Sequence, residues 1–201
     1  MRSPDEIRER YAEICTQVGV GVTVVAATKY VSLEEMGALV EAGIEVVGEN
    51  RVQDLAAKHD RYGSHFRWHF IGHLQSRKAP LVSELCELCH SLASESAIAR
   101  LKIPALVEVN LAAEDTKSGI APEELEGFLG LCAAAGVEVR GLTTMPPLAE
   151  DRERSRPYFR RLRELAERFG LAELSMGTSQ DFEVAAEEGA TYVRVGGVLW
   201  R

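Results

Sequence analysis

The segment Val22-Thr23-Val24-Val25-Ala26-Ala27-Thr28-Lys29 places a run of small, mostly β-branched residues directly before a single lysine. A continuous apolar run of this kind is typical of a parallel strand that is covered on both faces. Such strands place chemistry at their carboxyl ends, so we expect Lys29 to lie at a functional edge. Burial there would favour its neutral, nucleophilic amine. A lysine that only extends from a strand edge into solvent is the alternative.

Helices and strands alternate along the rest of the chain. Capping residues and glycine stops predict helices at residues 3–17, 32–42, 51–62, 76–85, 94–100, 121–136, 151–169 and 178–188. Apolar runs predict strands at residues 22–29, 44–47, 67–72, 87–92, 105–111, 137–144, 171–176 and 191–195.

This alternation implies a parallel sheet of the α/β class, and eight repeats predict closure into a single (β/α)8, TIM-type barrel spanning residues 1–201. An open, doubly wound sheet is the alternative. It is weakened because no G-x-G-x-x-G motif follows the first strand.

The composition is that of an acidic globular protein. The 201 residues carry a formal net charge of −8, with 46% hydrophobic and 27% charged residues. A packed core is therefore expected, and general binding to nucleic acid or to an anionic membrane is not. Residues 1–10 do not resemble a signal peptide, and no apolar run is long enough to span a membrane.

The cysteines are expected to be reduced thiols in a cytoplasmic protein. They are Cys15, Cys86, Cys89 and Cys132. One C-x-x-C pair without a second pair does not complete a zinc site, so no metal site is predicted.

Three histidines, His65, His69 and His73, recur every four residues, which would suit metal ligands on a helix. The segment around them is predicted to be a strand, in which this spacing spreads the rings over about 13 Å. Ligands of one metal ion lie closer together. We therefore expect His69 to be a barrel-interior or packing residue.

In a barrel, the residues after all eight strands meet at one mouth and form one set. Besides Lys29 and the last two loops, the set contains Glu49, Asn50, His73, Gln75, Asn110 and Met145.

The last two strands run into Ser175-Met176-Gly177-Thr178-Ser179 and Arg194-Val195-Gly196-Gly197. Barrels most often bind phosphate at these two loops. The glycines would let an anion approach the backbone, and the hydroxyls of Thr178 and Ser179 would add donors. A tight turn with a helix cap would need only one of these residues. We therefore predict a phosphate site, while Arg194 either faces the mouth or forms a core salt bridge.

A phosphate site, a lysine and an arginine at one mouth fit pyridoxal 5′-phosphate (PLP), held by a Schiff base and a phosphate cup. A class I aldolase acting on a sugar phosphate is an alternative, because it also uses a Schiff-base lysine. Glu49 is the one obvious carboxylate in the set that could serve it as acid or base.

Motifs along nearly the whole chain resemble the pyridoxal-phosphate homeostasis proteins, which share the alanine racemase N-terminal-like barrel. In chain order they are residues 26–29 (AATK), 48–53 (GENRVQ), 68–78 (WHFIGHLQSRK), 109–110 (VN), 117–119 (KSG), 141–146 (GLTTMP), 174–179 (LSMGTS) and 193–196 (VRVG).

The resemblance implies that Lys29 forms the internal aldimine with PLP. It implies Arg194 as the partner of the pyridine nitrogen and Asn50 and Met145 as ring contacts. An arginine there would keep that nitrogen unprotonated and weaken the ring as an electron sink. The phosphate cup that it implies consists of Ser175, Gly177, Ser179, Gly196 and Gly197.

The racemases and decarboxylases of this fold carry a further β-domain with a catalytic tyrosine, which is not expected here because the sequence ends at Arg201. The resemblance therefore implies a non-catalytic protein that binds, stores or delivers PLP, with apo PLP-dependent enzymes as partners. We expect a monomer, because no apolar seam remains after the helices pack. The alternative is a small racemase or decarboxylase reduced to its barrel, although no tyrosine is expected at a strand end.

Several positions depart from the family pattern. Gly197 stands where threonine is usual, which removes one hydroxyl donor, and Arg77 replaces the asparagine usual before Lys78. The connection over residues 93–103 is short, and the sequence ends at Arg201 without the usual closing helix. These departures bear on barrel closure and phosphate affinity.

Overall fold

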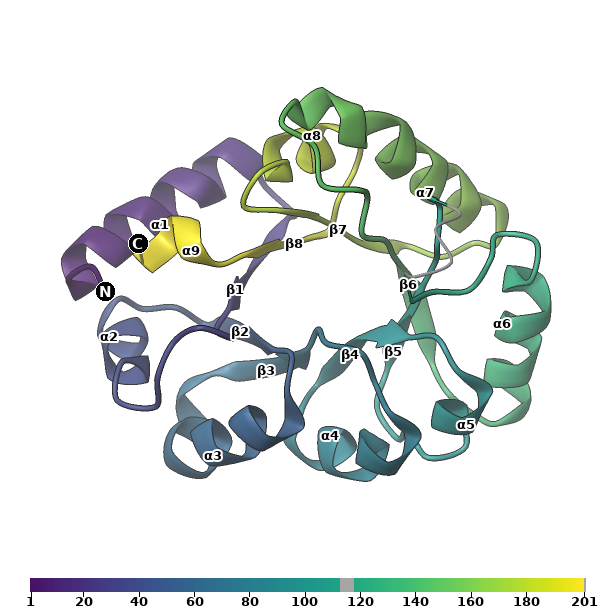
Figure 1. Ribbon diagram of the computed structural model, residues 1–201, viewed down its shortest axis with the longest axis horizontal. Helices are drawn as coiled ribbons and strands as arrows, with labels where there is room; N and C mark the ends of the chain where they lie inside the picture. The colour runs from purple at the N-terminus through teal and green to yellow at the C-terminus, as the bar shows by residue number, and fades with distance from the viewer. Residues whose placement is uncertain (113–117, 201) are drawn as a thin grey trace.

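The computed structural model describes residues 1–112 and 118–200, so Lys117 of the KSG motif and Arg201 lie outside the described residues. Eight parallel strands form a closed barrel in sequence order, and helices surround it (Figure 1). The predicted (β/α)8 barrel is confirmed. The strands are β1 Thr23–Ala27, β2 Val46–Glu49, β3 Arg67–Phe70, β4 Leu88–Leu92, β5 Ala105–Glu108, β6 Val139–Thr143, β7 Glu173–Thr178 and β8 Tyr192–Val195.

Each predicted helix has a counterpart in the structure. The helices are α1 Pro4–Val18, α2 Met36–Glu41, α3 Val52–Tyr62, α4 Ala79–Leu85, α5 Glu95–Ile98, α6 Leu125–Ala134, α7 Arg156–Arg168, α8 Phe182–Glu187 and α9 Gly197–Trp200. Single 3-10 turns lie at η1 Gly63–His65, η2 Ser76–Lys78 and η3 Arg152–Ser155.

Five helices, α2, α4, α6, α7 and α8, begin three to five residues later than predicted, and hydrogen bonds explain the late starts of α2 and α8. Ser32 and Glu35 do form reciprocal cap hydrogen bonds of 2.8 and 3.3 Å, but they close a turn, and α2 begins only at Met36. Before α8, the carboxylate of Asp181 binds the backbone N–H of Thr178 at 2.7 Å and holds residues 178–181 as a turn. In both places a side chain satisfies the backbone without a helix.

The apolar core lies between the outer face of the barrel and the ring of helices. In β1, Val24 and Ala26 join this core, whereas Val25 is buried beside Arg194 of the neighbouring strand β8. In α1, the capping box of Ser3 and Glu6 starts the helix, and its apolar face packs inward. Burying each large apolar side chain of this core stabilises the fold by about 2 kcal/mol.

The end of the described chain corrects one expectation. A closing helix was not predicted, but the one-turn helix α9 follows β8, and its Leu199 and Trp200 are buried. The backbone N–H of Arg2 donates to the carbonyl of Trp200 at 3.1 Å, so the first and last described residues lie side by side (Figure 1). Because β8 also pairs with β1, the barrel is closed.

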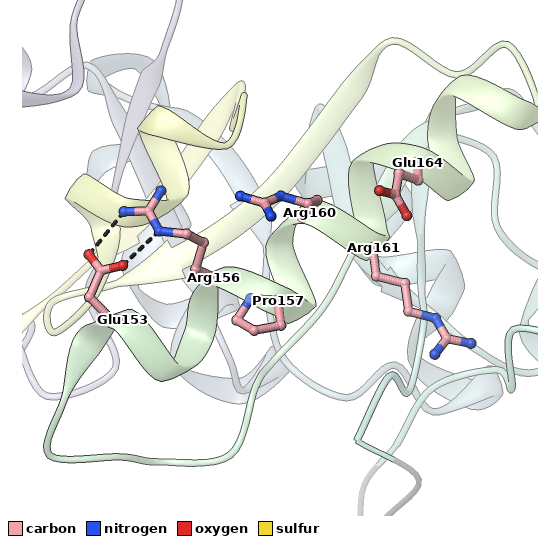
Figure 2. Close-up of a pocket in the computed structure, with 6 residues that line it drawn as sticks. All are labelled: Glu153, Arg156, Pro157, Arg160, Arg161 and Glu164. Carbon is pink, nitrogen blue, oxygen red and sulfur yellow. Dashed lines mark hydrogen bonds and ion pairs between the residues drawn. The ribbon is translucent and has the colours of Figure 1, made fainter.

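Charged residues of α7 and α8 form a network on the outer surface. Figure 2 shows Arg156 bound to Glu153, and the same guanidinium also binds Glu187 at 2.6 Å and Glu188 at 3.1 Å. These pairs join α7 to α8, so we assign Arg156 a structural role. No helix among the described residues is both long and apolar enough to cross a bilayer.

Candidate functional site

Arg194 lies inside the barrel and is only 7% exposed. Its Nη1 donates to Thr143 Oγ1 at 2.8 Å, to the carbonyl of Ser175 at 2.9 Å and to Ser175 Oγ. Its Nη2 donates to the carbonyl of Thr144 at 3.1 Å and to Met145 Sδ at 2.9 Å. Among the described residues no carboxylate pairs with it, so the core salt bridge considered from the sequence is not found.

Burial lowers the pKa of Arg194 to about 10, and the carboxylates of Glu108 and Asp181 oppose that change. The guanidinium therefore remains charged at neutral pH. A buried cation held by neutral acceptors keeps its charge available to a ligand at the mouth.

Two histidines extend this hydrogen-bond network into the barrel. His90 Nδ1 lies 2.8 Å from Ser175 Oγ, and His90 Nε2 lies 2.9 Å from His69 Nδ1. Ser175 Oγ accepts from Arg194, so its hydroxyl hydrogen is left to donate to His90 Nδ1. His90 then donates through Nε2 to His69 Nδ1. The chain of donors therefore runs in one direction, from Arg194 to His69.

Both histidines are neutral at pH 7. Burial, reinforced by the charge of Arg67, lowers the pKa of His69 to about 4, and burial lowers the pKa of His90 well below its usual value. The prediction that His69 is a barrel-interior residue is confirmed, because it is 2% exposed and its ring packs edge-to-face against the ring of Tyr192. His90, which the sequence analysis missed, links His69 to the site.

Ser175 differs from the role that the resemblance implies. The residue is fully buried, and its hydroxyl is engaged by Arg194 and His90. Leu174 and Met176 on either side face the outer core, so the period of two in a strand turns Ser175 inward. Its hydroxyl orients Arg194 and is not an open donor for phosphate.

The two glycine loops lie against each other at the mouth. The backbone N–H of Gly196 donates to Ser179 Oγ at 3.1 Å, and Thr178 is the register partner of Arg194. Thr178 is less open than predicted, because its N–H and its hydroxyl both donate to Asp181 Oδ1, at 2.7 and 3.1 Å. The second oxygen of Asp181 accepts from Ser155 at 2.7 Å, which fixes the loop.

Gly177 is required by the shape of its loop. Its φ is +89°, in the left-handed region that favours glycine. A Cβ at this position would lie 2.5 Å from the Cβ of Ala185 in α8, so the loop packs directly on that helix. Gly197 begins α9 directly after this pair of loops.

Lys29 lies two residues beyond the end of β1 and is exposed, so the expected burial of its side chain is wrong. Its Nζ lies 4.9 Å from the centre of the Tyr30 ring. Tyr30 is itself 66% exposed, and the expectation that no tyrosine follows a strand end is therefore also wrong.

A buried ion pair supports the end of β1. Lys58 Nζ binds Glu49 Oε1 at 2.5 Å and the carbonyl of Thr28 at 2.9 Å, and the Thr28 hydroxyl donates to the same Glu49 oxygen at 2.6 Å. The side chains of Lys58 and Glu49 are 6% and 0% exposed. Lys58 was missed as a site residue, although its spacing from Leu55 and Tyr62 puts it on the buried face of α3.

The remaining predicted residues lie at the rim. Asn50 is half-buried, and its Oδ1 is covered but has no hydrogen-bond partner among the described residues. Met145 is 48% exposed above Arg194. Both line cavities at the mouth, and the inner cavity of about 60 Å³ is bordered by Arg194, Met145, His73, His90 and Glu108, among others.

The match to known proteins covers the whole barrel. The model of the alanine racemase N-terminal domain matches residues 3–201. The chain is 38% identical to the pyridoxal phosphate homeostasis protein of Aquifex aeolicus, over 96% of this chain and 94% of that protein.

Solved structures agree with this match. PipY of Synechococcus elongatus, solved with PLP bound, superposes with a TM-score of 0.87 at 30% identity, covering 97% of this chain and 100% of that one. An alanine racemase of Clostridium difficile shares the fold, with a TM-score of 0.78 at 12% identity, and this chain covers 56% of its length. The chain thus belongs to the pyridoxal phosphate homeostasis protein family, whose barrel is that of the alanine racemase N-terminal domain.

Proposed function

We propose that the protein binds PLP at the barrel mouth and acts in PLP homeostasis without catalysing a reaction of its own, with residues 1–201 forming one cofactor-binding domain. The observation that carries the proposal is Arg194: a buried, charged guanidinium without a carboxylate partner among the described residues. It lies next to two glycine loops that a hydrogen bond joins.

The residues present fit each part of PLP. The phosphate would lie at the loops of Gly177, Thr178, Ser179, Gly196 and Gly197, where backbone amides and the Ser179 hydroxyl meet. The pyridine nitrogen needs a donor, which Arg194 supplies. The side chains of Asn50 and Met145 would contact the ring. The names of the relatives and the PLP in PipY support this assignment.

When bound, PLP would supply an aldehyde that condenses with a primary amine. Lys29 offers an exposed amine, whereas the amine of Lys58 is tied to Glu49. The ion pair below fixes Thr28 and thereby the position from which Lys29 extends. Arg194, held positive by its acceptors, would keep the pyridine nitrogen unprotonated, which suits a holder better than a catalyst.

The aldolase alternative loses its acid or base in this arrangement. Glu49 is fully buried, and its Oε1 is bound by Lys58 and Thr28. No other carboxylate was expected beside Lys29.

A small PLP-dependent racemase or decarboxylase is the second candidate, and Tyr30 favours it. The ring lies beside the Lys29 amine, where an acid or base would be needed. Purified, PLP-loaded protein incubated with a panel of amino acids separates the two functions. The carrier account expects no racemisation or decarboxylation, and turnover that is lost in Tyr30→Phe would contradict it.

We further propose a cytoplasmic monomer that passes PLP to apo-enzymes. All four cysteines are free thiols, which supports a reducing compartment. Among the described residues, the few large apolar side chains that are exposed, such as Val20 and Leu131, come from different segments of the chain.

The absorption spectrum tests the cofactor assignment directly. Protein saturated with PLP and then freed of excess cofactor should be yellow, and Lys29→Ala should lose the colour. Lys102→Ala, an exposed lysine before β5, is the matched control and should stay yellow. A yellow Lys29→Ala protein or a colourless wild-type protein would rule out the assignment.

A further inference from the structure

Two segments that carry the family resemblance meet in a second cavity at the mouth. Residues 50–53 lead into α3, which begins at Val52, and residues 73–78 follow β3. The proposed PLP site uses only Asn50 from this set. Between them lies a cavity of about 220 Å³. Gly72 brings the segments together, because a Cβ there would lie 2.1 Å from the carbonyl oxygen of Asn50.

The walls of this cavity carry positive charge and amide groups. Its floor is apolar, with Val52 and Phe70 only 5% and 1% exposed. The polar lining consists of Asn50, Arg51, Gln53, His73, Gln75 and Lys78, and none of the lining residues is a carboxylate. In a chain of net charge −8, this lining is a local positive region that suits an anion.

The lining contains two cations, Arg51 and Lys78. Within the described residues, the side chains of Arg51 and Lys78 make no hydrogen bond or ion pair, although Lys78 is half-buried. Arg156 of α7 is different, because it binds Glu153 (Figure 2) and also Glu187 and Glu188. The buried carboxylate of Glu49, which precedes Asn50 in the chain, is already paired with Lys58. Arg51 and Lys78 are therefore available to an anion, and the fork of Arg51 suits a planar carboxylate.

One acceptor in the lining of the cavity, Asn50 Oδ1, lacks a hydrogen-bond donor among the described residues. Asn50 Oδ1 is covered and has no partner in the described part of the chain, and a covered acceptor is costly unless an N–H or O–H reaches it. An occupant that satisfies both sides of the cavity carries a carboxylate at one end and an amine nearby.

The cavity adjoins the cofactor site. His73 lines both this cavity and the inner cavity of Arg194 and Met145. We propose that the cavity binds a free α-amino acid, with its carboxylate at Arg51 and Lys78 and its ammonium at Asn50 Oδ1. As a site for an amine-bearing ligand beside PLP, this inference rests on the proposed function, but its binding test does not.

Calorimetric titration of cofactor-free protein tests the site. L-Alanine should bind saturably and more tightly than acetate or methylamine, because each of these supplies one half of the contacts. Lys78→Met should weaken L-alanine binding about tenfold, the usual effect of losing one charge-assisted hydrogen bond, and Arg51→Met should act similarly. Lys102→Met, which removes an exposed lysine at the other end of the barrel, should bind as the wild type does.

Three results would overturn the inference: no saturable binding of L-alanine, equal loss in Lys78→Met and Lys102→Met, or tighter binding of inorganic phosphate than of L-alanine. PLP binding by the same proteins, followed by absorbance, is scored separately. A protein that binds PLP but not L-alanine refutes only this inference, and one that binds neither refutes the proposed function as well.

Discussion

The two halves of the barrel mouth are built differently. On the side of β6 to β8, Arg194 makes five hydrogen bonds to protein groups, and Ser179 ties the two glycine loops together. On the side of β1 to β3, Lys29, Arg51 and His73 are exposed, and Asn50 Oδ1 has no partner among the described residues. The β6–β8 side, the fixed half, is therefore held by hydrogen bonds before any ligand binds. The β1–β3 side, the open half, presents polar groups to a ligand. This division suits a protein that holds a cofactor at one end and exchanges it at the other.

The supports below the halves also differ. The buried ion pair of Lys58 and Glu49 supports the open half. The fixed half is supported by the uncharged hydrogen-bond network of Ser175, His90 and His69. Removing one partner of an ion pair leaves a buried charge, whereas interrupting an uncharged hydrogen-bond network leaves only unpaired polar groups. We therefore expect a substitution in the ion pair to lower the free energy of unfolding more than a substitution in the hydrogen-bond network.

The largest loss is expected for Lys58→Met, which leaves the Glu49 carboxylate buried without its cation. The free energy of unfolding should fall by about 3–5 kcal/mol, as measured by urea denaturation. Lys78→Met, at the open rim, is the control and should change stability little. A loss below about 1 kcal/mol in Lys58→Met would mean that the pair does not support this half.

The second-largest loss of stability is expected when acid protonates His69 in the fixed half. The pKa of His69 is lowered from 6.5 to about 4, so the unfolded chain binds more protons than the folded one between these values. This contribution is fully present above pH 6.5 and is lost as the pH falls to about 4; it amounts to about 3 kcal/mol at most. Urea denaturation of wild type and His69→Gln between pH 7 and 4 measures it. Equal pH dependence in both proteins would exclude His69 as its source.

Replacing His90 should have a smaller effect. His90→Leu removes the partners of Ser175 Oγ and of His69 Nδ1, and we expect a loss of about 2 kcal/mol. His90→Asn places an amide oxygen near the position of Nδ1 and should recover part of that loss. The same two variants report on Arg194 through PLP affinity, which should follow the order wild type, His90→Asn, His90→Leu. Equal PLP affinity in all three proteins would show that the hydrogen-bond network through His90 does not position Arg194.

The smallest change is expected for Ser179→Ala, which removes the hydrogen bond between the glycine loops. Stability should fall by about 1 kcal/mol, while affinity for PLP should fall more than affinity for pyridoxal, because only PLP carries the phosphate. Equal loss for both ligands would place the phosphate elsewhere.

The fold could be predicted because each of its signals is local. Capping boxes, glycine stops and apolar runs each act within a few residues, and eight repeats of strand and helix leave the barrel as the simplest closure. The starts of α2, α4, α6, α7 and α8 were placed too early. At α2 and α8 the reason is that a cap signal does not distinguish a turn from a helix. The helix α9 was missed because a single turn depends on packing against α1.

The site was only partly predictable, since its supports come from separate elements. Lys29, Asn50 and Arg194 could be found because strand ends meet at one mouth. Lys58 and His90 reach the site from α3 and from inside β4, where no strand-end rule applies. The inward direction of Ser175 could have been inferred from its apolar neighbours Leu174 and Met176, which alternate with it.

The central claim is that Lys29 anchors PLP at this mouth. Borohydride reduction of the PLP-loaded protein, followed by protease digestion and mass spectrometry of the peptides, locates the modified lysine. The account predicts a single phosphopyridoxyl group on the peptide that contains Lys29. A group on Lys58 or Lys78, or none on any lysine, would contradict it.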